Sequence, residues 1–444
     1  MAADFRNIIS QLNDMASSLA LVENVTLDRW IQWIELSTWQ RLLVSCYILE
    51  SQQATLLARQ PLPSLFSESG VDLPFPAPTV LWDATTLNDW AIAAQQYSQS
   101  PQYVYEIARG SAVATCDSFQ SSLLIAAHYS QFESSTPCLD ATSLLYIENH
   151  LDDSFSTRQK LLTAKLVQVA PLRALLAVSG ESWILSEKVP SQQVFSQLKT
   201  TLRSWVHQLW SATTPNSDPV PVIVALALSL NILQQALDER PESLSLEMGT
   251  DMSLYFAALV LWTITAAASA RAKGAREVPH SAPHRQPSQP AAHHASTSVP
   301  STPTQLSQST SSYPELRPTP TLAHLPGLVH SQLTSPVRHD TLASTTLISH
   351  EHITLNSASF LSEAQHLISI DPISQSELNM SRLQAGCISL LLWVKLQLRG
   401  APHEEQSGMA VWSSRPGEGL GELLDSVVGS LERVLNRGWS GWGL

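Results

Sequence analysis

The chain has 444 residues, of which 44% are hydrophobic and only 14% are charged. This length is sufficient for two or three domains with buried cores, and the low charge indicates long segments of uncharged polar residues. The net charge of -13 argues against unaided binding to nucleic acid or to anionic membranes, because the average field of the protein repels phosphate groups.

Residues 1–272 are predicted to form one run of helical segments. From Leu27, apolar residues recur every three or four positions (Leu27, Ile31, Ile34, Leu42, Cys46, Leu49), which places them on one helical face. Thr26 is expected to cap this helix. Because Trp30, Trp33 and Trp39 widen the apolar face, we expect the helix to be buried between several neighbours.

Five prolines between Pro61 and Pro78 predict an ordered loop after this helix, since each proline removes a backbone donor and restricts the residue before it. Further helices are expected near residues 86–98, 101–114, 118–131, 140–151, 157–178, 191–210, 221–238 and 251–272. Strand signals are sparse, so the predicted fold class is all-α.

Two apolar segments need a separate interpretation. Met252 to Ala270 runs for 19 residues without a charge, which is long enough to cross a membrane. Its last residues are mostly Ala, Ser and Thr, and no basic cluster flanks it, so we interpret it as a buried core helix. A membrane anchor is the alternative. Val222 to Leu233 is short for a span and is interpreted as a second core helix.

Residues 273–356 are predicted to be a disordered insert. The segment is rich in Pro, Ser, Thr and His and cannot bury enough apolar surface to offset chain entropy. Its histidines are irregularly spaced and have no cysteines among them, which argues against a metal site. Residues 357–444 are expected to return to helices, near 358–369, 374–399 and 418–436, and to pack on the first block.

No pattern in the chain indicates an enzyme, a cofactor or a metal. The four cysteines, Cys46, Cys116, Cys138 and Cys387, are too far apart for a zinc site. Phosphate-binding glycine loops are absent, and the turn at Ser182 lacks the second glycine of a nucleophile elbow. The amino terminus lacks a signal peptide, so secretion is not expected.

Four stretches, taken in order, resemble the fungal-specific transcription factor domain, also called the middle homology region. The first two are a tryptophan-rich helix, in which Gln40 replaces a usual arginine, and a Leu-Pro-x-Pro loop. The third and fourth are similar to the branch attached to Cys2His2 zinc fingers. The matching positions are Trp30, Trp33, Glu35, Arg41, Glu50, Arg59 and Pro61; Leu73, Pro74, Pro76, Trp82 and Trp90; Gly180, Glu181, Trp183 and Lys188; and Tyr255 and Trp262.

The resemblance implies an all-α regulatory domain on the carboxyl side of a DNA-binding module, tuning transcription by RNA polymerase II in the nucleus. Its expected partners are other transcription-factor subunits, co-regulators or a second copy of the chain. Zinc is expected only in a DNA-binding module absent from this sequence, so DNA would be reached through a partner or a missing exon. A helical scaffold without a transcriptional role and a membrane protein anchored by residues 252–270 are the alternatives.

Glu35 and Arg41 are six residues apart, too far to pair on one helical face. We therefore expect each to meet a group on another helix or in the 61–78 loop. If the Arg41 contact is buried, Arg41→Ala should destabilise the fold by roughly 3 to 5 kcal/mol.

Overall fold

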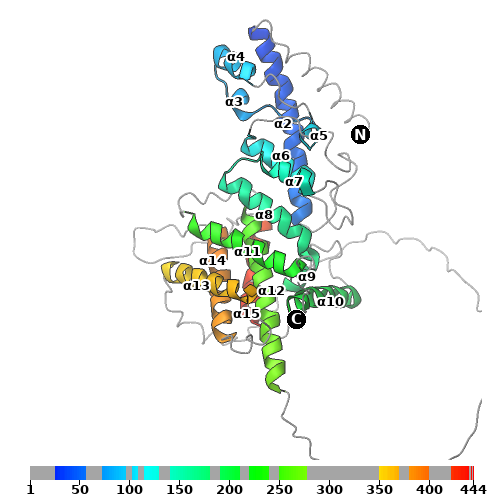
Figure 1. Ribbon diagram of the computed structural model, residues 1–444, viewed down its shortest axis with the longest axis vertical. Helices are drawn as coiled ribbons and strands as arrows, with labels where there is room; N and C mark the ends of the chain where they lie inside the picture. Colours follow the sequence, from blue (N-terminus) through cyan, green and yellow to red (C-terminus); the bar gives the residue numbers. More distant parts are fainter. Residues whose placement is uncertain are drawn as a thin grey trace, which may run out of the picture. The chain divides into compact units, whose positions relative to one another are not determined.

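The computed structural model describes residues 26–56, 73–96, 103–108, 115–129, 141–180, 191–210, 220–239, 250–277, 350–369, 380–399, 422–439, 442 and 444. Within these ranges every regular element is a helix, with fourteen α-helices, one short 3-10 helix and no β-strand (Figure 1). The predicted all-α class is confirmed.

The amino-terminal helices surround two small apolar clusters. They are α2 (Leu27–Leu56), α3 (Thr79–Trp82), α4 (Leu87–Gln96), α5 (Val104–Ala108), α6 (Ser118–Tyr129) and α7 (Ala141–Glu148). One cluster joins α2 to α6 around Val44 and Leu123, and the other joins α2 to α4 around Trp90. The hydroxyl of Thr26 accepts a hydrogen bond from the Arg29 amide, as expected of the cap of α2.

The remaining helices share one larger core. They are α8 (Phe155–Val169), α9 (Leu172–Ser179), α10 (Gln192–His207) with the 3-10 turn η2 (Gln208–Trp210), α11 (Pro221–Asp238), α12 (Thr250–Glu277), α13 (His350–Ser369), α14 (Met380–Arg399) and α15 (Glu422–Arg437). The carboxyl-terminal helices contact the earlier ones directly, α13 against α11 and α14 against α12. The predicted insert falls largely on residues 278–349, outside the described residues, but its two ends lie in α12 and α13.

Helix α12 is the centre of this core. It contacts α8, α9, α10, α11 and α14, and every residue from Met252 to Ala267 is buried. Among the described helices, α11 and the Thr250–Ala272 part of α12 are long and apolar enough to cross a membrane. In the most apolar 18 residues of each, 44% of the α11 residues and 94% of the α12 residues are buried within the protein. The prediction that Met252 to Ala270 forms a core helix is confirmed.

The single helix predicted over 157–178 is wrong, because the chain breaks at Pro171. Ala170 has an extended backbone with ψ 139°, and the axes of α8 and α9 differ by 90°. Proline lacks the amide that would continue the helix and disfavours helical geometry in the residue before it. The break turns α9 toward α10 and α15, which both contact it.

The prediction of which face of α2 is buried is also wrong. Leu27, Ile31, Ile34, Leu42, Cys46 and Leu49 are all exposed, as is Trp39. The buried face carries Leu36, Leu43, Val44, Tyr47, Ile48 and Ala54 together with Ser37, Gln40 and Ser51. Helix α2 has apolar residues at helical spacing on two faces, and periodicity alone does not say which one meets the core.

Candidate functional site: the Arg41 docking centre

The polar centre of the amino-terminal helices is built around Arg41, in the middle of α2. Its Nη2 atom donates a hydrogen bond to the carbonyl oxygen of Ala77 at 3.2 Å and to the hydroxyl of Thr79 at 3.3 Å. The expectation that Arg41 meets the 61–78 loop is therefore confirmed. The guanidinium also lies over the rings of Trp82 and Phe119, with its carbon 5.1 and 4.8 Å from the ring centroids.

Asp117 and Gln120 hold the same loop from the start of α6. The Asp117 carboxylate accepts hydrogen bonds from the backbone amides of Thr79 at 2.6 Å and Gln120 at 2.8 Å. The side chain of Gln120 accepts from the Asp117 amide in return, which completes a capping box. The Gln120 side-chain amide also donates to the buried carbonyl of Pro76 at 2.8 Å.

Together these side chains bind three backbone groups of the chain between Pro76 and Thr79, which leads into α3. A non-helical segment carries backbone groups that need partners when it is buried. Arg41 satisfies the Ala77 carbonyl, Gln120 satisfies the Pro76 carbonyl and Asp117 satisfies the Thr79 amide. We call Arg41, Asp117 and Gln120, together with the Pro76, Ala77 and Thr79 groups that they bind, the Arg41 docking centre.

The charge of Arg41 is half-buried and balanced by nearby carboxylates. Burial lowers the pKa of the Arg41 guanidinium, and the negative charges of Asp117 and Asp83 oppose that effect. Arginine nevertheless stays protonated in proteins. The centre therefore combines a fixed positive charge, two aromatic faces and a negative helix cap, an arrangement that binds peptide backbone.

The Leu-Pro-x-Pro loop enters the core just before this centre. Leu73 and Phe75 belong to the apolar cluster of α2 and α6, and Pro74 forms an isolated antiparallel bridge with Tyr103. The carbonyl of Leu73 accepts a hydrogen bond from the amide of Val104 at 3.1 Å, which fixes the start of α5.

Three tryptophans of the first two resembling stretches, Trp30, Trp33 and Trp90, meet on one side of α2. Trp30 and Trp33 pack against the small cluster around Leu81 and Trp90, and the rings of Trp33 and Trp90 lie 5.7 Å apart at an angle of 56°. The indole N–H groups of Trp30 and Trp90 are buried without an acceptor among the described residues. These side chains position α4 through apolar contact.

The other predicted positions have separate places. Glu35 is exposed on α2, and among the described residues the contact predicted for it with another helix or the loop is not seen. Glu50 is half-buried. Gly180 ends α9 with φ 107°, and a Cβ atom there would lie 2.9 Å from the side chain of Arg433. Tyr255 and Trp262 are buried in α12, far along the chain from Arg41. Arg59, Pro61, Glu181, Trp183 and Lys188 lie outside the described residues.

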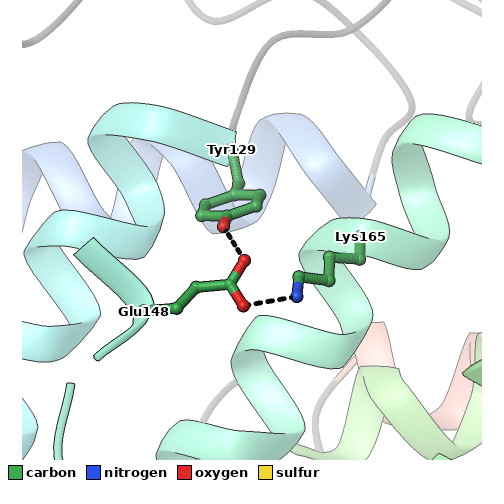
Figure 2. A network of polar contacts seen from close by, with 3 residues as sticks. All are labelled: Tyr129, Glu148 and Lys165. Atoms are coloured by element: carbon green, nitrogen blue, oxygen red, sulfur yellow. Dashed lines mark hydrogen bonds and ion pairs between the residues drawn. The ribbon is translucent and has the colours of Figure 1, made fainter. Parts of the chain in front are cut away.

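A second polar network, which sequence reasoning missed, joins α6, α7 and α8 (Figure 2). Glu148, the last residue of α7, accepts a hydrogen bond from the hydroxyl of Tyr129 at the end of α6. Its other oxygen lies 2.8 Å from Nζ of Lys165 on α8. Burial, the hydrogen bond to Glu148 and the charge of Glu148 together raise the pKa of Tyr129. This network fixes the contact between α6 and α8.

The contacts at both sites hold segments of the chain against one another. In the parts of the chain that the structure describes, no group of three His, Cys, Asp or Glu side chains is placed to hold a metal ion. His128 is buried in α6, and burial lowers its pKa from 6.5 to about 4, so it is neutral at physiological pH.

Asp117 and Gln120 were visible in the sequence as an Asp-x-x-Gln capping pattern, but their contacts with Thr79 and Pro76 were not. Glu148 and Lys165 carried no local signal, because they lie on different helices and are 17 residues apart.

Comparison with known proteins finds a family match in the amino-terminal part of the chain. No curated protein and no solved structure matches. The family model of the fungal specific transcription factor domain matches residues 5–112, which contain the tryptophans of α2, Arg41 and the Leu-Pro-x-Pro loop. The third and fourth resembling stretches lie beyond the matched residues. Residues 5–112 are thus similar to the fungal specific transcription factor domain.

Proposed function

We propose that this chain regulates transcription by RNA polymerase II in the nucleus and acts through contacts with other proteins. The observation that carries the proposal is the match of residues 5–112 to a transcription factor domain rather than to an enzyme family. Most residues of the Arg41 docking centre lie within the matched range, so the family match and the docked loop concern the same part of the chain.

The proposal includes indirect contact with DNA. The net charge of -13 opposes binding to a phosphate backbone, and the cysteine spacing offers no zinc finger. DNA recognition would then come from a partner subunit or co-regulator, or from a zinc module encoded outside this sequence. The likeness of the third and fourth stretches to regulators with Cys2His2 fingers favours a module of that type.

The test tethers the full chain to a reporter promoter through an unrelated DNA-binding domain in a fungal cell. We expect reporter output to change relative to that DNA-binding domain alone. The matched control carries Trp262→Ala, which removes a buried core side chain and should abolish the change. Unchanged output with the intact, nuclear fusion would contradict the proposal and favour a helical scaffold without a transcriptional role.

Two further measurements address the remaining parts of the proposal. In a gel-shift assay at physiological salt the purified chain should leave DNA unshifted, and tight binding by the chain alone would contradict indirect recognition. In cell extracts treated with alkaline carbonate the chain should be released from membranes, because α12 is enclosed by other helices. Retention in the membrane pellet would favour the membrane-anchored alternative.

A further inference from the structure

Helices α10 and α15 each carry two positively charged side chains one helical turn apart. Lys199 and Arg203 form the pair on α10, and Arg433 and Arg437 form the pair on α15. The three arginines are exposed, and Lys199 is half-buried. Helix α9 contacts both α10 and α15, so the two pairs belong to one group of packed helices. We call these four residues the basic patch.

The electrostatics of Lys199 show that the two pairs share one positive region. Burial lowers the pKa of Lys199, and the positive charges of Arg437 and Arg203 lower it further. Arg41 differs, because the carboxylates near it oppose the effect of burial. Cations from two helices therefore act on the same point, and the repulsion between them would be relieved if an anion bound there.

The acidic residues of the two helices leave the basic patch positive. Helix α10 contains no Asp or Glu. On α15, Glu432 forms an ion pair with Lys395 of α14, with 2.6 Å between the charged atoms. Glu422 and Asp425 come at least eight residues before Arg433, which is about 12 Å along a helix. Solvated surfaces usually mix both signs of charge, so four clustered cations are unusual in a chain with a net charge of -13.

Three of these cations are held in position by the fold. Nζ of Lys199 lies 5.1 Å from the centroid of the Phe195 ring, and the guanidinium carbon of Arg437 lies 4.4 Å from that of the Trp442 ring. Arg433 donates a hydrogen bond of 3.4 Å to the backbone carbonyl at the end of α9. Side chains that are already held lose less conformational freedom on binding, so the basic patch is preorganised for an anion.

We propose that the basic patch binds an acidic peptide segment of a partner protein. Each cation pair spans about 6 Å along its helix, which matches carboxylates one helical turn apart in a peptide. Gln192 and Ser196 continue the α10 face that carries Lys199 and Arg203, and both are exposed and uncharged. The inference rests on the proposed function, because it names the chemistry of the protein through which the chain would act.

The net charge favours a peptide over nucleic acid as the occupant. At physiological ionic strength, charges farther apart than about 8 Å are largely screened, so a short acidic peptide would meet mainly the basic patch. The phosphates of a DNA duplex would also extend over other surface of a chain whose net charge is -13. Duplex DNA is therefore the competing occupant that the test must exclude.

Fluorescence anisotropy of a labelled decaglutamate peptide tests the inference with the full chain. We expect binding that weakens as the salt concentration rises, and no binding of decaglutamine. Lys199→Gln combined with Arg203→Gln should weaken decaglutamate binding about tenfold, because two of the four cations are lost. Arg433 is left in place, since its contact with α9 also supports the fold.

The matched control removes the same number of positive charges elsewhere. Arg158 on α8 and Arg382 on α14 are exposed, and Arg158→Gln combined with Arg382→Gln should bind decaglutamate as tightly as the natural chain does. Helical circular dichroism checks that both double variants are folded. Equal weakening in the two double variants, or no decaglutamate binding at low salt, would overturn the proposal. Tighter binding of a short DNA duplex than of decaglutamate would overturn it as well.

The peptide measurement and the reporter experiment have separate outcomes. Binding of decaglutamate at the basic patch, with unchanged output from the tethered chain, would leave the patch standing and contradict the transcriptional function. Changed reporter output without decaglutamate binding would leave the function standing and contradict the patch.

Discussion

The helices around α12 and the helices around α2 bury their apolar residues in different ways. Between Met252 and Ala267, helix α12 carries no charge and is buried on all sides, so its place in the fold requires no choice of face. Helix α2 has two apolar faces and buries only one of them. The second region also holds a loop through Arg41, Asp117 and Gln120. The first has a smaller buried polar contact, in which the Gln159 side chain donates to the Ile232 carbonyl and accepts from the Ser253 hydroxyl.

This comparison indicates which region contributes most to the stability of the fold. The core around α12 is large and contains helices from both sides of residues 278–349. The region around α2 has smaller clusters, a docked loop and an exposed apolar stripe. We infer that the α12 core carries most of the folding free energy.

The largest expected effect is on the α12 core. Trp262→Ala should lower the free energy of unfolding by about 3 to 5 kcal/mol, because a fully buried tryptophan leaves a cavity. Its ring also packs edge-on against Trp442 at 4.7 Å, so the carboxyl terminus should loosen too. Denaturant unfolding measures the loss, with the exposed Leu355→Ala as a control that stays within about 0.5 kcal/mol. A similar small loss for both variants would place α12 outside the main core.

The next effect concerns the Arg41 docking centre. Arg41→Ala should cost about 3 kcal/mol, because the carbonyl of Ala77 loses its donor and the negative cap at Asp117 loses a nearby positive charge. Arg41→Lys should recover part of the loss, since a lysine keeps the charge but not the planar fork. Thermal unfolding measures both variants, and an unchanged melting temperature for Arg41→Ala would contradict the docking of the 76–79 segment.

A comparable loss of folding stability should appear as the pH is lowered, because of His128. Its pKa is lowered from 6.5 to about 4 by burial, so the folded state binds the proton more weakly than the unfolded chain does. The stabilising contribution is complete above pH 6.5 and is lost as the pH falls toward 4, by up to roughly 3 kcal/mol. His128→Phe should therefore show a flatter stability profile than the natural chain between pH 6.5 and 4. Parallel profiles would show that His128 titrates normally.

The smallest effect concerns the contact between α6, α7 and α8. Glu148→Gln keeps an acceptor for Tyr129 but removes the ion pair with Lys165, and should cost about 1 kcal/mol because both side chains are partly exposed. Glu363→Gln, which breaks the more exposed pair with Arg382, is the matched control and should cost less. The difference between the two variants in urea unfolding checks the prediction. The prediction fails if Glu363→Gln lowers the free energy of unfolding as much as Glu148→Gln does.

The sequence patterns predicted the parts of the fold that need no tertiary information. An uncharged stretch from Met252 to Ala270 can form only a membrane span or a core helix, and the composition of its second half favoured the core. The six-residue separation of Glu35 and Arg41, too long for a pair on one helical face, indicated a contact of Arg41 outside its own helix. The break at Pro171 follows from the residue itself, but the apolar spacing continues across it and favours a single helix.

The remaining contacts depend on the arrangement of distant segments. Two faces of α2 have apolar residues at helical spacing, and their burial is decided by α4 and α6, which follow later in the chain. In the same way, Glu148 gains its role only when α6 and α8 bring Tyr129 and Lys165 beside it. Local spacing contains no information on such pairs.

The orientation of α2 is the central claim, since the core contacts of the amino-terminal helices follow from it. Leu42 and Leu43 are neighbours in sequence, but Leu42 is 52% exposed and Leu43 is 6% exposed. Denaturant unfolding should show a loss of about 2 to 5 kcal/mol for Leu43→Ala and a change within about 0.5 kcal/mol for Leu42→Ala. The reverse order, with Leu42→Ala the more damaging, would contradict the account.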